Sequence, residues 1–431
     1  MEAAPYAGTW IEIMRKDAKR HTSVAAVIIA GLSFMLLTTA CGSGKIAVEA
    51  DATTAVQTDG TTDAASQEDT TGTEAVRQEE SAAASADETD NAADPAEVKK
   101  IKVKAIYLSG TSAGSSKILD RYIDVINTTE LNSVVIDVKE AGKVNYASAV
   151  PAVAENGLYV KYYDADKVIQ KLHDNNIYVI GRVVVFRDDG LATKRADLAI
   201  KRPGGSLWKE GKLGAWTNPY MEEVWQYNID IAKEAVEKGF DEIQFDYVRF
   251  PTAKKSEIDY GSDPAPRADT IAAFLKKAKT ELHDGLGVPV SADIFGIVAE
   301  SVSDGNAIGQ DLEKVGMDVD YISPMVYPSH YAKGQEVNGV KFPKPDLEPY
   351  EVVYQTLLKA KDRISKVSGY TAEVRPYLQD FTATWLHKGD YQEYGAEQVR
   401  QQIKAVYDAG YEEWILWDGR NSYSVDAFEK E

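Results

Sequence analysis

Cysteine is almost absent from this chain, because Cys41 is the only one among 431 residues. A single cysteine excludes a disulfide framework and a metal site built from several thiolates. The H-E-x-x-H pattern and paired histidines at ligand spacing are also missing, so we expect no metal and no cofactor. No G-x-G-x-x-G pattern follows the first predicted strand, which argues against a dinucleotide-binding loop.

Basic residues are also fewer than acidic ones, at 48 against 68, which gives a formal net charge of −20. This balance argues against a nucleic-acid partner and gives no support for a substrate dense in negative charge. The length of 431 residues and the hydrophobic content of 44% allow one large domain or two ordinary ones. We expect the protein to act as a monomer.

Long hydrophobic runs are missing too, since the apolar stretch Val24–Leu37 is short for a full membrane span. A basic cluster between Arg15 and Arg20 precedes this stretch, and small residues follow it up to Cys41. That order is typical of a secretory signal. The alternative is an uncleaved membrane anchor.

The residues before Cys41 resemble a bacterial lipobox, although Leu37 stands four places before the cysteine instead of three. The resemblance implies that Cys41 is lipidated and becomes the first residue of the mature protein. Either Met1 or Met14, which directly precedes the basic cluster, is the start of the chain. We therefore expect an extracytoplasmic lipoprotein that is attached to the bacterial cell membrane.

Large apolar residues are nearly missing between Gly42 and Ala96, where Ala, Thr, Ser, Asp and Glu dominate. Such a composition cannot bury enough surface to offset the entropy cost of ordering the chain. The sequence thus predicts three parts: a signal segment over residues 1–41, a disordered tether over 42–97, and a folded domain over 98–431.

The folded part alternates short apolar strands with amphipathic helices. The predicted strands are Val103–Leu108, Ser133–Lys139, Ile177–Phe186, Glu242–Phe250, Val288–Phe295, Tyr321–Tyr327, Val374–Gln379 and Glu413–Trp417. The predicted helices are Lys117–Asn127, Ala165–Asn175, Met221–Lys238, Arg267–Leu286, Gly309–Val315, Glu348–Val367 and Gly395–Ala409. Asp164 and Asn218 are predicted N-caps. Eight such units predict an α/β fold of the (β/α)8 barrel type, with an open doubly wound sheet as the alternative.

The stretch Gly239–Pro251 carries the most informative strand, in which Gln244 and Asp246 share one face. A carboxylate on the inner face near the C-terminal end of a strand is where such barrels place their chemistry. Arg249 lies close enough in sequence to favour the ionised carboxylate. The alternative is a purely structural Asp–Arg pair.

Polar and aromatic residues are enriched where the predicted strands end, whereas the opposite ends of the strands show no such enrichment. The candidates at these C-terminal ends include Asp137, Glu140, Asp246, Asp293, Tyr327, His330, Gln379 and Trp417. Because the C-terminal ends of barrel strands meet at one mouth, these residues predict a functional site there.

Several segments resemble the bacterial “putative glycoside hydrolase domain” family, a (β/α)8 group. They include V-V-I-D-V-K at Val134–Lys139, the stretch Gly239–Pro251, V-S-A-D-I-F-G at Val290–Gly296 and D-Y-I-S-P-M-V-Y-P-S-H-Y at Asp320–Tyr331. The resemblance covers roughly Ile101 to Val425. It implies a barrel that cleaves sugars.

Glycoside hydrolysis requires two carboxyl groups, one ionised and one protonated. We assign Asp246 as nucleophile or ionised stabiliser and Asp293 as acid/base, with Asp137 and Glu140 as reserve candidates. The run Gln244-Phe245-Asp246 is similar to the Arg-x-Asp of amylase-type barrels. Since Gln replaces the Arg of that pattern, Arg249 or Arg182 has to supply the positive charge.

Sugar rings present apolar faces to aromatic side chains and hydroxyls to polar ones. The predicted substrate-binding residues are Arg182, Trp216, Arg249, Tyr327, His330, Gln379 and Trp417. The leading hypothesis is an exported, lipid-anchored glycoside hydrolase that acts on an envelope or extracellular polysaccharide. The alternatives are a glycan-binding barrel without catalysis, and a lyase or transglycosylase.

Overall fold

The computed structural model describes residues 101–212, 214–261 and 265–430. The predicted signal segment, Cys41 and the tether lie outside these residues. No helix in the described ranges is both long enough and apolar enough to cross a membrane.

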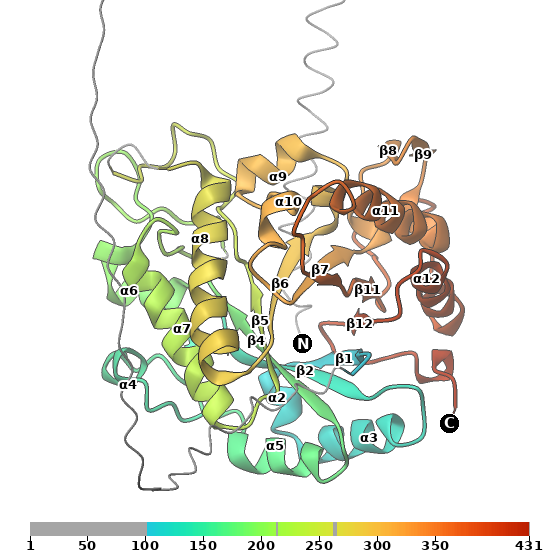
Figure 1. Cartoon of the computed structure of the whole chain (residues 1–431), viewed down its shortest axis with the longest axis horizontal. Coiled ribbons are helices and arrows are strands. Elements are labelled where there is room, and N and C mark those ends of the chain that lie inside the picture. The colour runs from blue at the N-terminus through green and yellow to red at the C-terminus, as the bar shows by residue number, and fades with distance from the viewer. Residues whose placement is uncertain (1–100, 213, 262–264, 431) are drawn as a thin grey trace, which may run out of the picture. The chain divides into compact units, whose positions relative to one another are not determined.

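Eight parallel strands form a closed barrel at the centre of the domain (Figure 1). In barrel order from β1 they are β1 (Lys104–Leu108), β2 (Ser133–Glu140), β4 (Tyr178–Val184), β5 (Glu242–Asp246), β6 (Val290–Phe295), β7 (Tyr321–Val326), β11 (Tyr377–Gln379) and β12 (Trp414–Trp417). The first strand pairs with both β2 and β12, which closes the sheet. The (β/α)8 prediction is confirmed, and the open doubly wound sheet is wrong.

Two of the predicted strands differ from the observed ones for local reasons. The predicted strand Glu242–Phe250 stops at Asp246 because Tyr247 adopts a left-handed backbone with φ of 49°. The predicted strand Val374–Gln379 is interrupted after β10 (Glu373–Val374), since Pro376 has no N–H to continue the ladder.

Helices surround the barrel, with α7 and α8 on one side and α11 and α12 on the other (Figure 1). The long helices are α3 (Ser116–Ile126), α5 (Ala165–His173), α7 (Glu222–Glu237), α8 (Arg267–Lys279), α11 (Pro349–Ile364) and α12 (Ala396–Asp408). The short ones are α2 (Gly110–Ala113), α4 (Pro151–Asn156), α6 (Asp189–Lys194), α9 (Val302–Ile308) and α10 (Leu312–Val315). Sequence periodicity misses α2, α4, α6, α9 and the hairpin of β8 (Gln335–Val337) and β9 (Val340–Phe342), because such short elements span too few turns or alternations.

The two predicted N-caps have different outcomes. Asp164 caps α5, and its carboxylate accepts the backbone N–H of Lys167. Asn218 is not a cap, because α7 begins after Met221. The Asn218 side chain instead accepts the N–H of Tyr220 within the preceding turn.

Buried charges fill the N-terminal end of the barrel, so the prediction that these strand ends lack polar enrichment is wrong. Arg375 donates to Glu242 from Nη1 at 2.8 Å and to Glu413 from Nε at 2.8 Å. Glu242 also accepts a hydrogen bond from Ser291 at 2.6 Å. The guanidinium of Arg375 lies 3.8 Å from the centre of the Tyr321 ring. We call Arg375, Glu242 and Glu413 the barrel floor.

A layer of neutral polar groups lies between this floor and the mouth. Gln244 accepts a hydrogen bond from the Tyr377 hydroxyl at 2.5 Å and donates to Ser323 at 3.2 Å. These contacts join β5, β7 and β11 across the interior. Gln244 thus links strands across the barrel interior, and the partners of Asp246 are other residues.

Candidate active site

A β-bulge in β2 creates the acidic side of the mouth. In the pairing with β4, Asp137 is opposite Arg182 and Lys139 is opposite Val183, so Val138 is an extra residue. A bulge of this kind changes which face the following side chains occupy. As a result, Asp137 and Glu140 both point into the barrel although they are three residues apart.

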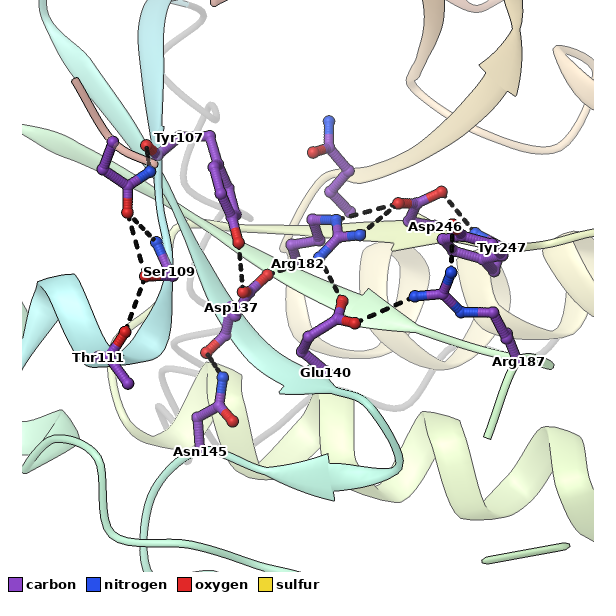
Figure 2. A network of polar contacts seen from close by, with 12 residues as sticks. Tyr107, Ser109, Thr111, Asp137, Glu140, Asn145, Arg182, Arg187, Asp246 and Tyr247 are labelled. Atoms are coloured by element: carbon purple, nitrogen blue, oxygen red, sulfur yellow. Dashed lines mark hydrogen bonds and ion pairs between the residues drawn. The ribbon is translucent and has the colours of Figure 1, made fainter. Parts of the chain in front are cut away.

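Arg182 joins the carboxylates of this site (Figure 2). Its Nη1 donates to Asp137 at 2.6 Å and to Glu140 at 2.9 Å. Its Nη2 and Nε donate to the Oδ2 of Asp246 at 2.5 and 3.1 Å. The planar guanidinium suits such multiple contacts. Arg182 therefore supplies the positive charge beside Asp246.

The chain turns sharply after two of these carboxylates. Tyr247 follows Asp246 and Ala141 follows Glu140, and each has a φ of 49°. The turn at Tyr247 lets its backbone N–H bind Oδ1 of Asp246 at 2.6 Å. A left-handed conformation costs a non-glycine residue about 1–3 kcal/mol and is concentrated at functional sites. At Ala141 the positive φ belongs to the two-residue hairpin turn between β2 and β3 (Lys143–Val144), where Gly142 also has a positive φ. The strain at Tyr247 has no such turn to explain it and agrees with a functional role for that strand end.

Two ion pairs connect β2 to the segment after β4 (Figure 2 draws the inner one). On the outer side, fully buried Lys139 binds Asp188 at 2.6 Å and the amide oxygen of Asn228 at 2.7 Å. On the inner side, Glu140 binds Arg187 at 3.2 Å. Glu140 follows Lys139 in the chain, and Arg187 precedes Asp188. The buried Lys139–Asp188 pair therefore fixes the position of Glu140.

The protonation of the carboxyl groups differs across the site. Asp293 is buried, and its Oδ1 has no hydrogen-bond partner among the residues that the structure describes. Burial, and then the charge of Asp246, raise the pKa of Asp293 well above its usual value. Burial also raises the pKa of Asp137 to about 6, against the opposing charge of Arg182. Asp293 is therefore the carboxyl group best suited to hold a proton near neutral pH.

The β1 and β12 side of the mouth is aromatic. The Tyr107 hydroxyl donates to Asp137 at 2.6 Å, and the Tyr107 ring stacks on Trp417 with 4.0 Å between ring centres. Arg182 lies 5.3 Å from the centre of the Trp417 ring. Trp417 is partly exposed, as a sugar-binding ring has to be.

Trp216 and Arg249, both predicted to bind substrate, lie within the wall of the barrel. Trp216 is fully buried, donates to Glu210 at 3.0 Å and is covered by the guanidinium of Arg249 at 4.9 Å. Arg249 also lies 4.6 Å from the ring centre of Phe295 and donates to the carbonyl of Phe250.

Trp216 and Arg249 also contact the ring of Tyr247, whose centre lies 6.0 Å from that of the Trp216 ring and 5.3 Å from the Arg249 guanidinium. The hydroxyl of Tyr247 accepts a hydrogen bond from Arg187. The two residues therefore support the Arg187 side of the network.

The other predicted binding residues follow β7 and β11. Tyr327 and His330 meet edge to face with ring centres 5.2 Å apart. Gln379 is buried, accepts hydrogen bonds from the backbone and hydroxyl of Ser329, and donates to Asp346. With its side-chain oxygen and nitrogen both engaged, Gln379 joins the loop after β7 to β11.

Sequence reasoning missed Tyr107. It places Lys139 and Arg187 at strand ends beside the mouth but misses the pairing of Arg187 with Glu140 and the outward role of Lys139. Tyr107 stands near the end of the first strand, so its position alone is a usable signal. The two others depend on the bulge at Val138, which a regular two-residue alternation does not reveal.

Two cavities among the described residues lie away from this network. One of about 670 Å³ is lined by residues of α3 and α5, and one of about 860 Å³ is lined by Lys104, Glu373 and neighbours at the N-terminal strand ends. Within the described residues, no group of three or more His, Cys, Asp or Glu side chains is arranged to hold a metal ion. The candidates for chemistry are the carboxylates that Arg182 joins at the mouth.

Comparison with solved structures agrees with this fold. The glycoside hydrolase domain of PgaB (BpsB) from Bordetella bronchiseptica is 12% identical over 75% of this chain and 95% of its own, with a TM-score of 0.54. A hypothetical protein from Ruminiclostridium thermocellum ATCC 27405 is 44% identical over 44% of this chain and 96% of its own, with a TM-score of 0.41. No curated protein matches the chain.

The family described as “Putative glycosyl hydrolase domain” matches residues 105–423, which is most of the 431-residue chain and includes every carboxylate of the site. This match confirms the resemblance seen in the sequence motifs. The chain therefore belongs to the “Putative glycosyl hydrolase domain” family.

Proposed function

We propose that this protein hydrolyses an envelope or extracellular polysaccharide, with Asp246 and Asp293 as its catalytic pair. The observation that carries the proposal is the contrast between the two groups. Asp246 accepts hydrogen bonds from Arg182 and from the N–H of Tyr247, whereas the neighbouring Asp293 is buried with a strongly raised pKa. An ionised and a protonated carboxyl group are what glycoside hydrolysis needs.

The strand positions favour a retaining mechanism. Asp246 ends β5 and Asp293 lies on β6, and neighbouring strands lie about 4.8 Å apart. Retaining enzymes hold their carboxyl groups about 5–5.5 Å apart, against about 6.5–9.5 Å for inverting ones. NMR detection of the first anomer released from the substrate tests this, and an inverted first product would contradict it.

In this mechanism Asp246 attacks the anomeric carbon while Asp293 gives its proton to the leaving glycosidic oxygen. Asp293 then removes a proton from water, the water oxygen attacks the anomeric carbon, and Asp246 is released as a carboxylate. Arg182 orients Asp246 for attack and stabilises the carboxylate that the second step releases.

A glycan-binding barrel without catalysis remains the rival, and the burial of Asp293 favours it, because a proton donor has to reach the substrate oxygen. A screen of the purified domain against bacterial polysaccharides, with reducing ends counted, separates the two functions. Release of reducing ends that stops in Asp246→Asn supports hydrolysis. Glycan binding without any release supports the rival.

Replacement of Asp293 by asparagine tests the acid role. We expect Asp293→Asn to lower turnover of substrates with poor leaving groups by about 10²–10⁴-fold, because they need a proton. Aryl glycosides with activated leaving groups need none, so their first step survives. A uniform loss across both substrate types, measured as kcat/KM, would contradict proton donation by Asp293.

The proposed location is the outer face of the cell membrane, through a lipid on Cys41. The basic and apolar segments before this cysteine support it. We expect Cys41→Ala to stay as an uncleaved precursor or to leave the membrane fraction. Unchanged processing together with unchanged labelling by a lipid precursor would contradict lipid anchoring.

A further inference from the structure

Four rings lie together where β7 and β11 end: Tyr327, His330, Phe381 and Trp385. His330 meets Tyr327, Phe381 and Trp385 edge to face, with ring centres 5.2, 6.1 and 6.1 Å apart. Phe381 and Trp385 stack nearly parallel at 5.7 Å. We call these four residues the aromatic platform.

The platform begins at the catalytic pair and leads away from it. Tyr327 is close enough to Asp293 and Asp246 for their charges to raise the pKa of its hydroxyl, after the larger effect of burial. His330 contacts both Tyr327 and Trp385 and so connects them. Phe381 and Trp385 are partly exposed. The platform is therefore placed to hold a part of the polymer next to the bond that is cleaved.

Hydrogen bonds fix the loop that carries His330 to the loop that carries Phe381. The Ser329 hydroxyl lies 3.0 Å from Nδ1 of His330 and donates to Gln379 at 2.7 Å. Gln379 also donates to the carbonyl of Phe381 at 3.0 Å. The two loops are thus fixed to each other before any ligand binds, which lowers the entropy cost of binding.

One polar atom of the platform lacks a partner. The indole Nε1 of Trp385 is buried and has no hydrogen-bond acceptor among the residues that the structure describes. A buried donor without an acceptor is costly, and tryptophan N–H groups usually find one. Because this atom is shielded from solvent, the partly exposed indole has to turn before an acceptor on a ligand can reach it, and that hydrogen bond would then remove the cost.

The charge of the mouth limits the ligand further. Asp137, Glu140 and Asp246 form ion pairs with Arg182, and Glu140 also pairs with Arg187. Asp293 adds no negative charge while it holds its proton, so three carboxylates face two guanidinium groups, and this balance disfavours an acidic sugar. The ligand then carries no negative charge and has apolar faces with a carbonyl or hydroxyl acceptor.

We propose that the aromatic platform is a subsite for an N-acylated hexosamine unit of the polymer. The pyranose ring and the acyl methyl group cover Phe381 and Trp385, and the acyl carbonyl accepts the Trp385 N–H. This assignment rests on the proposed hydrolase function, because it names the sugar class that the same mouth accepts.

Binding to inactive protein tests the subsite separately from catalysis. In the Asp246→Asn background, calorimetric titration compares N-acetylglucosamine oligomers with glucose oligomers of equal length. We expect tighter binding of the acylated series and a loss on the order of tenfold or more in Trp385→Ala, from the lost ring face and hydrogen bond. Tyr162→Ala, an exposed ring on another loop, serves as control and should change nothing.

Phe381→Leu is a second variant that keeps the test valid if Trp385→Ala does not fold. It keeps apolar volume but removes a ring, so it should also weaken binding. Unchanged affinity in both variants would overturn the subsite, and an equal loss for both oligomer series would overturn the N-acyl assignment. If acylated oligomers bind through Trp385 but the unmutated protein cleaves none, the subsite stands and the hydrolase proposal fails.

Discussion

Asp246→Asn is expected to lower turnover by about three to four orders of magnitude, which corresponds to roughly 4–6 kcal/mol of barrier. Asparagine keeps the size of the side chain and can still accept the N–H of Tyr247. It cannot act as a nucleophile or stabilise the developing positive charge. Turnover per folded molecule, measured together with the melting temperature, checks this expectation.

Asp380→Asn is the matched control for that experiment. Asp380 is also a buried aspartate at a strand end, and it accepts hydrogen bonds from Ser424 instead of joining the Arg182 network. We expect this variant to lose stability and to keep turnover per folded molecule. An Asp246→Asn protein that behaved in the same way would end the assignment of Asp246 as a catalytic residue.

Arg375→Met is expected to cause the largest loss of stability, about 3–5 kcal/mol at neutral pH. The substitution leaves Glu242 and Glu413 buried in the barrel floor without their shared cation. Chemical denaturation of the variant and of the unmutated domain measures the difference. Arg195→Met is the control, because Arg195 also binds two carboxylates, Asp197 and Glu223, but at the surface. There we expect little or no loss of stability, because water and salt screen surface ion pairs.

The loss in Arg375→Met should shrink as the pH falls. Burial raises the pKa of Glu242, and Arg375 opposes that rise. Without Arg375 the folded state holds the Glu242 proton to a higher pH than the unfolded state does. Folding then takes up a proton, so stability increases towards acid pH and decreases as the pH rises. A loss that stays constant between neutral and mildly acid pH would contradict this account.

The barrel itself could be predicted from the sequence because its strands are continuous apolar runs. A strand such as Val290–Phe295 is buried on both faces, and such a run fits few secondary structures other than a strand. The exact strand ends were less predictable, since a left-handed Tyr247 or a strand break at Pro376 is a local backbone event.

For the candidate site, the sequence was sufficient to find the carboxylates but not their partners. The sequence leaves Arg182 and Arg249 as two alternatives for the positive charge beside Asp246. Only the register of β4 against β2 and β5 decides between them. The barrel floor was missed because Glu242 and Arg375 each resemble a surface charge until the fold brings them together. Long-range pairings of this kind leave no local pattern.

The extra residue in β2 has a consequence for how this family can vary. If β2 kept all of its residues but lost the bulge at Val138, strict alternation would return, and the positions after Asp137 would exchange faces. The lysine would then enter the mouth and the glutamate would face α7. A relative that lost Val138 itself would keep both acids inward, because they would then lie two positions apart. Any descendant that keeps this chemistry must therefore match the number of residues between the two acids to the presence or absence of the bulge.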